Sequence, residues 1–144
     1  MARWTRRDFL KATVGAGILA GTPTAPGQAA ARRTATDWVK LGKSNVEVTR
    51  LAFGTGTFGG RVQRELGQDG FTRLVRHAYD RGIRFFESAD AYRTHTLLAE
   101  ALKGIPRETY RLMTKMRWRG QSETPMQAID RFRKELNTDY IDIL

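Results

Sequence analysis

The stretch RFFESADAY, at residues 84–92, decides the fold, because an apolar strand pattern passes directly into a polar loop. The strand ends at the carboxylate of Glu87, and Tyr92 follows five residues later. A second apolar run, at residues 110–115, ends in Lys115. Parallel strands bring their carboxyl ends to one edge of a sheet. An acid, a phenol and an amine delivered to that edge can form a proton-transfer site.

Strand-like and helix-like segments alternate on both sides of this stretch. Apolar residues recur with helical spacing at residues 69–81, which predicts an amphipathic helix capped by Gly82. Thr124, Pro125 and Gln127 supply an N-cap, a proline at the first helical position and a capping-box glutamine for a later helix. The full expected order is a β-hairpin at 38–49, strands at 50–53, 83–87, 110–115 and 140–144, and helices at 69–81, around 97–102 and from Thr124.

Such alternation predicts an α/β fold with a parallel sheet covered by helices, and two architectures compete for it. The run GTGTFG at residues 54–59 has the spacing of a doubly wound dinucleotide fold. We expect a loop at 60–68 before the next helix, however, so that no helix N-terminus would meet these glycines. A (β/α)8 TIM barrel accommodates such a loop. We therefore expect a partial (β/α)8 TIM barrel, made of its first four strands and preceded by a β-hairpin.

The bulk composition limits the class of protein. The 144 residues form one domain or part of one, and 40% hydrophobic residues is a globular composition. The absence of cysteine excludes disulfides, cysteine-ligated metals and thiol nucleophiles. His77 and His95 have no metal-ligand neighbours in the sequence, so we interpret both as non-catalytic and expect no metal site. The net charge of +10 is dispersed along the chain, which argues against a nucleic-acid partner.

The first 31 residues have the features of an export signal. The run TRRDFLK at residues 5–11 resembles a twin-arginine motif, and a weakly apolar stretch follows at 12–20. That stretch is too short to be a stable membrane anchor, and the small residues at 29–31 suit a signal peptidase. We expect 1–31 to be a twin-arginine signal peptide and 32–144 the mature domain, with the twin-arginine export machinery as a partner and a periplasmic or exported location. An amphipathic N-terminal helix is the alternative.

From Trp38 to Leu144 the chain resembles the N-terminal half of the aldo/keto reductase family. Five segments match in order: LGKS at 41–44, RLAFGTGTFG at 50–59, DRGIRFFESADAY at 80–92, LMTK at 112–115 and LNTDYIDIL at 136–144. The resemblance implies a TIM barrel with a hairpin at its base, bound NADP(H) or NAD(H), and reversible reduction of a small-molecule aldehyde or ketone to an alcohol by hydride transfer. It also implies a fragment, because the family's catalytic histidine and phosphate-binding residues would lie beyond Leu144.

The family's catalytic set of Asp, Tyr, Lys and His maps onto three residues of this chain. Tyr92 and Lys115 match directly, and Glu87 occupies the aspartate position. The resemblance implies that Tyr92 is the general acid, that Lys115 eases proton release from the phenol, and that Glu87 orients the lysine. The family usually has glycine after the tyrosine, where this chain has Arg93.

The same resemblance assigns cofactor contacts to Gly56, Thr57 and Phe58, and places Glu87 near the ribose. Trp118 follows the third expected strand, where it would line a substrate or nucleotide pocket or belong to an exposed basic loop.

Two other functions stay open at this point. The main alternative is a non-catalytic nucleotide-binding or sensor protein on the same barrel, for which Glu87 would mark relaxed catalysis. A basic nucleic-acid or envelope-surface module would require basic residues clustered on one face, and here they are dispersed.

Overall fold

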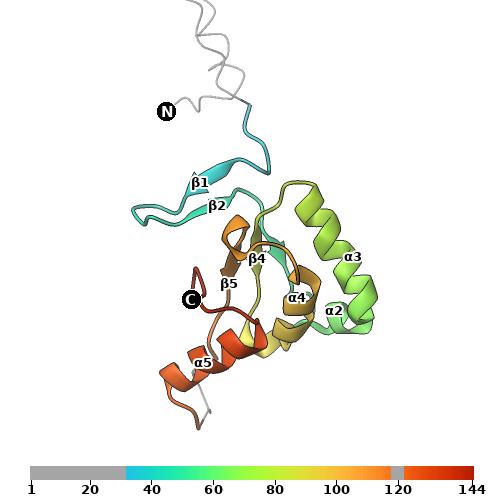
Figure 1. Ribbon diagram of the computed structural model, residues 1–144, viewed down its shortest axis with the longest axis vertical. Helices are drawn as coiled ribbons and strands as arrows, with labels where there is room; N and C mark the ends of the chain where they lie inside the picture. The colour runs from blue at the N-terminus through green and yellow to red at the C-terminus, as the bar shows by residue number, and fades with distance from the viewer. Residues whose placement is uncertain (1–31, 118–121) are drawn as a thin grey trace, which may run out of the picture. The chain divides into compact units, whose positions relative to one another are not determined.

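Three short parallel strands form the centre of the fold in the computed structural model, which describes residues 32–117 and 122–144 (Figure 1). Arg33–Leu144 forms one compact unit. The expected signal peptide and Trp118 lie outside the described residues. In chain order the elements are β1 (Trp38–Lys40), β2 (Glu47–Thr49), β3 (Phe53–Gly54), α2 (Arg61–Glu65), α3 (Gly67–Asp80), β4 (Phe85–Glu87), the 3-10 helix η1 (Asp90–Tyr92), α4 (His95–Leu102), the 3-10 helix η2 (Arg107–Thr109), β5 (Arg111–Met113) and α5 (Pro125–Glu135).

The central sheet has the order β3-β4-β5, and all its strands are parallel. Gly54 lies opposite Glu87, and Glu87 lies opposite Met113, so the three strands end level with one another. The ladder continues past these ends, because the Ser88 amide donates to the Met113 carbonyl oxygen at 2.8 Å. The expected α/β class with a parallel sheet is confirmed.

The expected hairpin is confirmed as the antiparallel pair β1-β2, with Val39 opposite Val48. Figure 1 shows this pair at one end of the parallel sheet. The Arg84 amide, just before β4, donates to Thr49 Oγ1 at 3.1 Å. The hairpin therefore covers the amino end of the parallel sheet. The carboxyl ends of β3, β4 and β5 lie on the opposite side.

The first expected strand, 50–53, is displaced in the structure. The Arg50 amide bonds to the carbonyl oxygen of Asp37, and the Leu51 amide bonds to that of Ala35. These two residues therefore belong to the hairpin side, and β3 begins only at Phe53.

The expected loop at 60–68 is wrong. Gly60, at φ 81°, leads directly into the short helix α2, and α3 begins at Gly67, at φ 65°. Five residues are too few to show a helical repeat of apolar residues, so the spacing pattern did not indicate α2. Because a helix does follow the glycines, the missing helix N-terminus is not a valid argument against a doubly wound fold.

The expected fourth strand, 140–144, is reduced to one parallel bridge between Met113 and Ile143. The Asp142 carboxylate accepts the Leu112 amide at 2.9 Å, and the amides of Asp142 and Ile143 both donate to the Leu112 carbonyl oxygen. This shared acceptor interrupts the regular ladder. The segment nevertheless lies on the β5 side of the sheet, where a fourth strand would follow, and the described residues do not form a closed barrel.

The core lies between the sheet and the helices α3 and α4. Phe71 of α3, Phe86 of β4 and Leu98 of α4 are fully buried. Phe86 packs edge-to-face on Tyr110, with ring centroids 5.9 Å apart. Burying a side chain of this size contributes about 1.5–3 kcal/mol. Among the described residues, no helix has the length and apolar character needed to cross a bilayer.

The expected cap of the first long helix is confirmed, because Gly82 follows α3 at φ 91°. Asn137 follows α5 at φ 50° and takes the same left-handed conformation. Thr124 and Gln127 form the expected reciprocal capping box at the start of α5.

Candidate functional site

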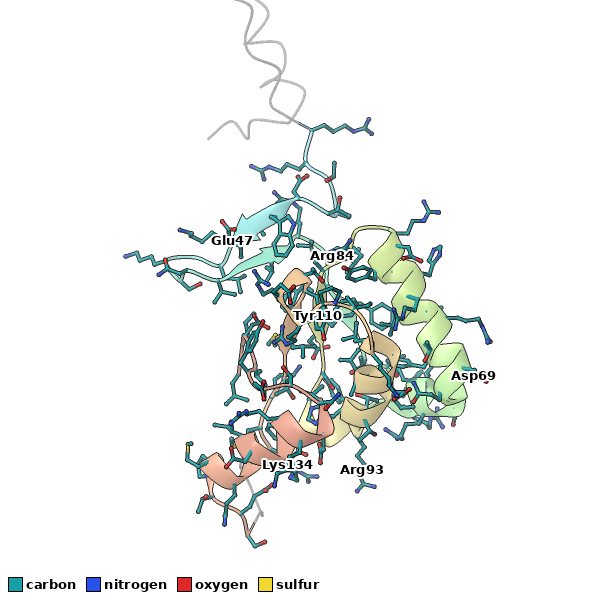
Figure 2. The ribbon with its side chains drawn as sticks, in the orientation of Figure 1. Glu47, Asp69, Arg84, Arg93, Tyr110 and Lys134 are labelled. Atoms are coloured by element: carbon teal, nitrogen blue, oxygen red, sulfur yellow. The ribbon has the colours of Figure 1, made fainter. Side chains whose placement is uncertain are left out.

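The carboxyl ends of β3, β4 and β5 form a rim opposite the hairpin. Gly54, Glu87 and Met113 stand side by side at these ends. Lys115 lies two residues beyond Met113, and its carbonyl oxygen accepts the Asp90 amide at 3.0 Å. Figure 2 shows Arg84 and Tyr110, which precede β4 and β5, at the hairpin end of the sheet, and Arg93, which follows η1, at the opposite end.

An ion pair joins two of the expected catalytic residues at this rim. The Lys115 Nζ contacts Glu87 Oε1 and also donates to the Ser88 carbonyl oxygen at 3.0 Å. The lysine and glutamate side chains are 43% and 22% exposed, so the pair is partly exposed to solvent. Burial lowers the pKa of Lys115, while the adjacent carboxylate favours its charged form. The contact holds the lysine side chain over the ends of β4 and β5.

Tyr92, the third expected catalytic residue, lies against the same pair. The Lys115 Nζ is 5.1 Å from the centroid of the Tyr92 ring. The ring also rests on Gly56, where a Cβ would stand 2.6 Å from Cε2 and Cζ and 2.9 Å from the hydroxyl oxygen. The ring can take this position only because residue 56 has no side chain. The structure thus brings Glu87, Tyr92 and Lys115 together.

The phenol oxygen of Tyr92 has no hydrogen-bond partner within residues 32–117 and 122–144. The lysine amine is directed to Glu87 and to the Ser88 carbonyl oxygen and approaches the phenol through the face of its ring. The hydroxyl is therefore available to a group placed above the rim.

The glycine-rich loop after β3 holds the residues expected to contact a cofactor. Phe58 is 76% exposed and has a φ of 49°. Gln63 Nε2 donates to Thr57 Oγ1 at 3.1 Å, which ties the loop to α2. Arg64 Nη1 donates to the carbonyl oxygens of Gly59 and Tyr92. The loop that carries Gly56, Thr57 and Phe58 is therefore bound to the backbone of Tyr92.

A buried polar layer beneath the rim was not indicated by the sequence. Thr94 Oγ1 lies 2.8 Å from Thr55 Oγ1 and 3.1 Å from Ser88 Oγ. All three side chains are fully buried, at the points where η1 and the strands β3 and β4 end. The three hydroxyls satisfy one another, so they stabilise the strand ends that carry the site.

His95 belongs to the same layer. It is 3% exposed, with Nδ1 2.7 Å from Glu135 Oε2 and Nε2 2.8 Å from Thr114 Oγ1. Its ring packs edge-to-face on Phe132 at 5.1 Å. The histidine thus joins α4, α5 and the end of β5, and its non-catalytic role stays a prediction. In the sequence, only Thr114, the residue before Lys115, indicated a polar partner at the end of this strand.

Comparisons with known proteins agree with this geometry. Residues 50–144 match the model of the aldo/keto reductase family. A Glycine max protein named probable aldo-keto reductase 1 is 33% identical over 122 residues, which are 73% of this chain and 34% of that protein. The chain therefore spans about a third of the length of this curated relative.

Two solved structures have the same fold over most of the chain. A Pseudomonas aeruginosa protein assigned to the aldo-keto reductases superposes with a TM-score of 0.62 at 30% identity, and the match covers 78% of this chain and 47% of that one. An aldo-keto reductase from Bacillus halodurans, in its holo form, superposes with a TM-score of 0.60 at 24% identity, covering 74% of this chain and 38% of that one. At 24% identity the second match supports the fold alone.

Proposed function

Since this chain belongs to the aldo/keto reductase family, we propose that the full-length protein is an oxidoreductase that reduces the carbonyl group of a small-molecule aldehyde or ketone to an alcohol. The single observation that supports this most is the meeting of Glu87, Tyr92 and Lys115 at one rim of the sheet. In this proposal the sheet is the first part of a (β/α)8 barrel, with the hairpin at its base.

The proposed chemistry places a proton donor where negative charge develops. A carbonyl that accepts hydride at carbon gains negative charge on oxygen, and the Tyr92 hydroxyl donates the proton that neutralises it. The Lys115 ammonium, 5.1 Å from the ring centroid, stabilises the negative charge left on the phenol. Glu87 keeps that amine charged and in position through their ion pair.

The loop after β3 fits a nucleotide cofactor. The exposed ring of Phe58 offers an apolar surface for a flat ring. Gln63 Oε1 is buried and has no hydrogen-bond partner among the described residues, although its Nε2 is bonded to Thr57. A buried acceptor without a donor is costly, and a hydroxyl or amide group of a ligand would satisfy it. When bound, NADP(H) or NAD(H) would supply the hydride.

Replacing Tyr92 by phenylalanine in the full-length protein tests this function. Removing a general acid should lower kcat by about 10²–10⁴-fold while the Kd of NADPH, followed by fluorescence titration, changes little. Tyr140→Phe is the matched control, because Tyr140 is partly exposed and lies beyond α5 rather than at the rim. Full turnover by Tyr92→Phe would exclude this mechanism.

A non-catalytic nucleotide-binding or sensor protein is the second candidate. Its supporting observation is the glutamate at position 87, where the family pattern has aspartate. Wild-type protein that binds NADPH but reduces no aldehyde or ketone would favour this candidate over the reductase.

We also propose that the protein is exported by the twin-arginine route, with residues 1–31 as its signal peptide. The support is the run TRRDFLK at residues 5–11. Residues 1–31 fused to a reporter that folds in the cytoplasm should direct it to the periplasm. A fusion with Arg6→Lys and Arg7→Lys should stay inside, and equal export of both fusions would refute the proposal.

A further inference from the structure

Three arginines surround a hollow beside the candidate site. The hollow has a volume of about 340 Å³ and is lined by Arg64, Asp90, Ala91, Arg93 and Arg117. It borders the proposed general acid, because Arg64 Nη1 donates to the Tyr92 carbonyl oxygen and Arg93 is the next residue in the chain. Arg117 lies two residues beyond Lys115. The hollow is therefore lined by the chain neighbours of Tyr92 and Lys115, while the side chains of Tyr92 and Lys115 do not line it.

The charges that line this hollow are unbalanced. Among the described residues, no carboxylate forms an ion pair with Arg64, Arg93 or Arg117. Within the part of the chain that the structure describes, Asp90 is the only acid in the lining, and its carboxylate is bound to Arg131 at 3.0 Å and is 13% exposed. Guanidinium groups match the geometry of carboxylate and phosphate oxygens, so the hollow attracts an oxyanion.

The backbone of Arg93 supports a role for its side chain. Arg93 has φ 54° and ψ 42°, a left-handed conformation that glycine adopts far more easily than arginine. An arginine in this conformation has a backbone cost that glycine would not have, and a binding role for its side chain would account for that cost. Figure 2 shows the Arg93 side chain extending away from the helices at the end of the molecule opposite the hairpin.

We propose that the hollow binds an anionic group of the substrate through Arg93 and Arg117, so that the enzyme prefers carbonyl compounds that carry a carboxylate or a phosphate. This inference rests on the proposed reductase function. Arg64 has a different part, because its guanidinium is already bonded to the carbonyl oxygens of Gly59 and Tyr92 and fixes the backbone beside the hollow.

A cofactor phosphate has the same chemistry as a substrate phosphate, and the position of the hollow favours the substrate. Arg93 and Arg117 line the hollow from the segments that carry Tyr92 and Lys115, whereas Arg64 lines it from α2, the helix that carries the unpartnered oxygen of Gln63. The substrate carbonyl must approach the Tyr92 hydroxyl, so a charged group on the same molecule falls within reach of Arg93.

Matched substrate pairs in the full-length protein test this inference. The pairs are 4-carboxybenzaldehyde with methyl 4-formylbenzoate, and glyceraldehyde 3-phosphate with glyceraldehyde. The wild type should have the higher kcat/KM for the anionic member of at least one pair. Arg93→Gln and Arg117→Gln should each lower that value on the order of 10-fold, mainly through KM, while the neutral member changes far less.

Three controls separate the explanations. Arg73→Gln removes an exposed arginine from α3, away from the hollow, and should leave every value unchanged. Arg93→Gly removes the charge and also relieves the backbone conformation, so it should reproduce Arg93→Gln without loss of thermal stability. The Kd of NADPH should be the same for all variants.

The outcomes are distinct. Equal use of both members of each pair, or equal losses on both in the arginine variants, would overturn the anion site. Weaker NADPH binding with unchanged substrate preference would assign the arginines to the cofactor and also overturn it. If wild-type protein turns over neither pair, the reductase proposal fails. Calorimetry then measures whether the protein binds 4-(hydroxymethyl)benzoate, which tests the anion site without turnover. Binding that weakens in Arg93→Gln would support the site, and absent or unchanged binding would refute it.

Discussion

Glu87 has one methylene more than the aspartate of the family pattern, and its surroundings accommodate that length. Its Oε1 contacts the Lys115 amine. Its Oε2 lies 3.1 Å from the point where a Cβ of Gly54 would stand, on the neighbouring strand. Because residue 54 has no side chain, the longer acid fits between the strand ends and still reaches the lysine.

We predict that Glu87→Gln shifts the pH profile of activity. In the folded protein, burial lowers the pKa of Lys115 and the Glu87 carboxylate opposes that shift. Without the carboxylate, the amine loses its proton at a lower pH. The alkaline limb of kcat/KM should therefore move to lower pH, and kcat at neutral pH should fall. Glu87→Asp keeps the charge and should move the limb less, whereas identical profiles for all three proteins would refute the coupling.

We predict that Gly56→Ala lowers activity with little effect on stability. The new Cβ would stand 2.6 Å from the Tyr92 ring, so the phenol must move. A displacement of about 1 Å can cost about 100-fold in rate. The measurement is kcat together with the thermal unfolding midpoint. Gly70→Ala is the matched control, because its Cβ would meet Leu66 at 3.3 Å in a helix away from the rim. Unchanged kcat in Gly56→Ala would show that the ring position does not matter.

At the scale of elements, α5 contributes two side chains, Arg131 and Glu135, that bind polar residues near the rim. Glu135 bonds to His95, and Arg131 forms ion pairs with Asp90, Glu123 and Glu135. Hydrogen bonds to Glu123 and Asp90 raise the pKa of Arg131, so the guanidinium stays charged. The ion pair between Arg131 and Asp90 therefore fixes the start of η1, which carries Tyr92. The helix that supplies this contact, α5, begins more than thirty residues later in the chain.

We predict that Thr124→Ala destabilises the fold by about 1 kcal/mol, because it removes the hydroxyl that accepts the Gln127 amide. The free energy of unfolding in urea measures this loss. Ser122→Ala, two residues earlier in the exposed segment, should change it by no more than a few tenths of that amount. A Thr124→Ala protein as stable as the wild type would show that the capping box is dispensable.

At the scale of the whole molecule, the two ends of the sheet differ in what lies on them. The hairpin covers the amino end, and the candidate residues gather at the carboxyl end, as in parallel barrels. Within the described residues the sheet has three strands and one bridge, so its outer strands keep unpaired backbone groups.

We predict that residues 32–144 produced alone self-associate and show no carbonyl reductase activity. Open strand edges pair with other chains, and both outer strands of this three-stranded sheet keep such edges. Sedimentation velocity at increasing concentration should show a rising average mass, and the dye ANS should bind. A monomer with cooperative unfolding and measurable turnover would contradict this prediction.

The local structure of this protein was largely readable from its sequence. The strand end at Glu87, the capping box at Thr124, and the left-handed caps at Gly82 and Asn137 all follow from short-range patterns, because backbone hydrogen bonding and apolar spacing act over a few residues. The strand expected to end at Lys115 ends two residues earlier, at Met113. The approach of Glu87, Tyr92 and Lys115 could also be expected, since parallel strands end on one side of a sheet.

Tertiary packing alone decided the rest. The bonds of His95 to Thr114 and Glu135 span 19 and 40 residues, and the hollow of Arg64, Arg93 and Arg117 gathers side chains from three segments. The helix α2 and the interrupted fourth strand depend on single glycines and on the Asp142 carboxylate. No local pattern encodes such contacts, because each arises only when distant elements pack together and their buried polar groups must find partners.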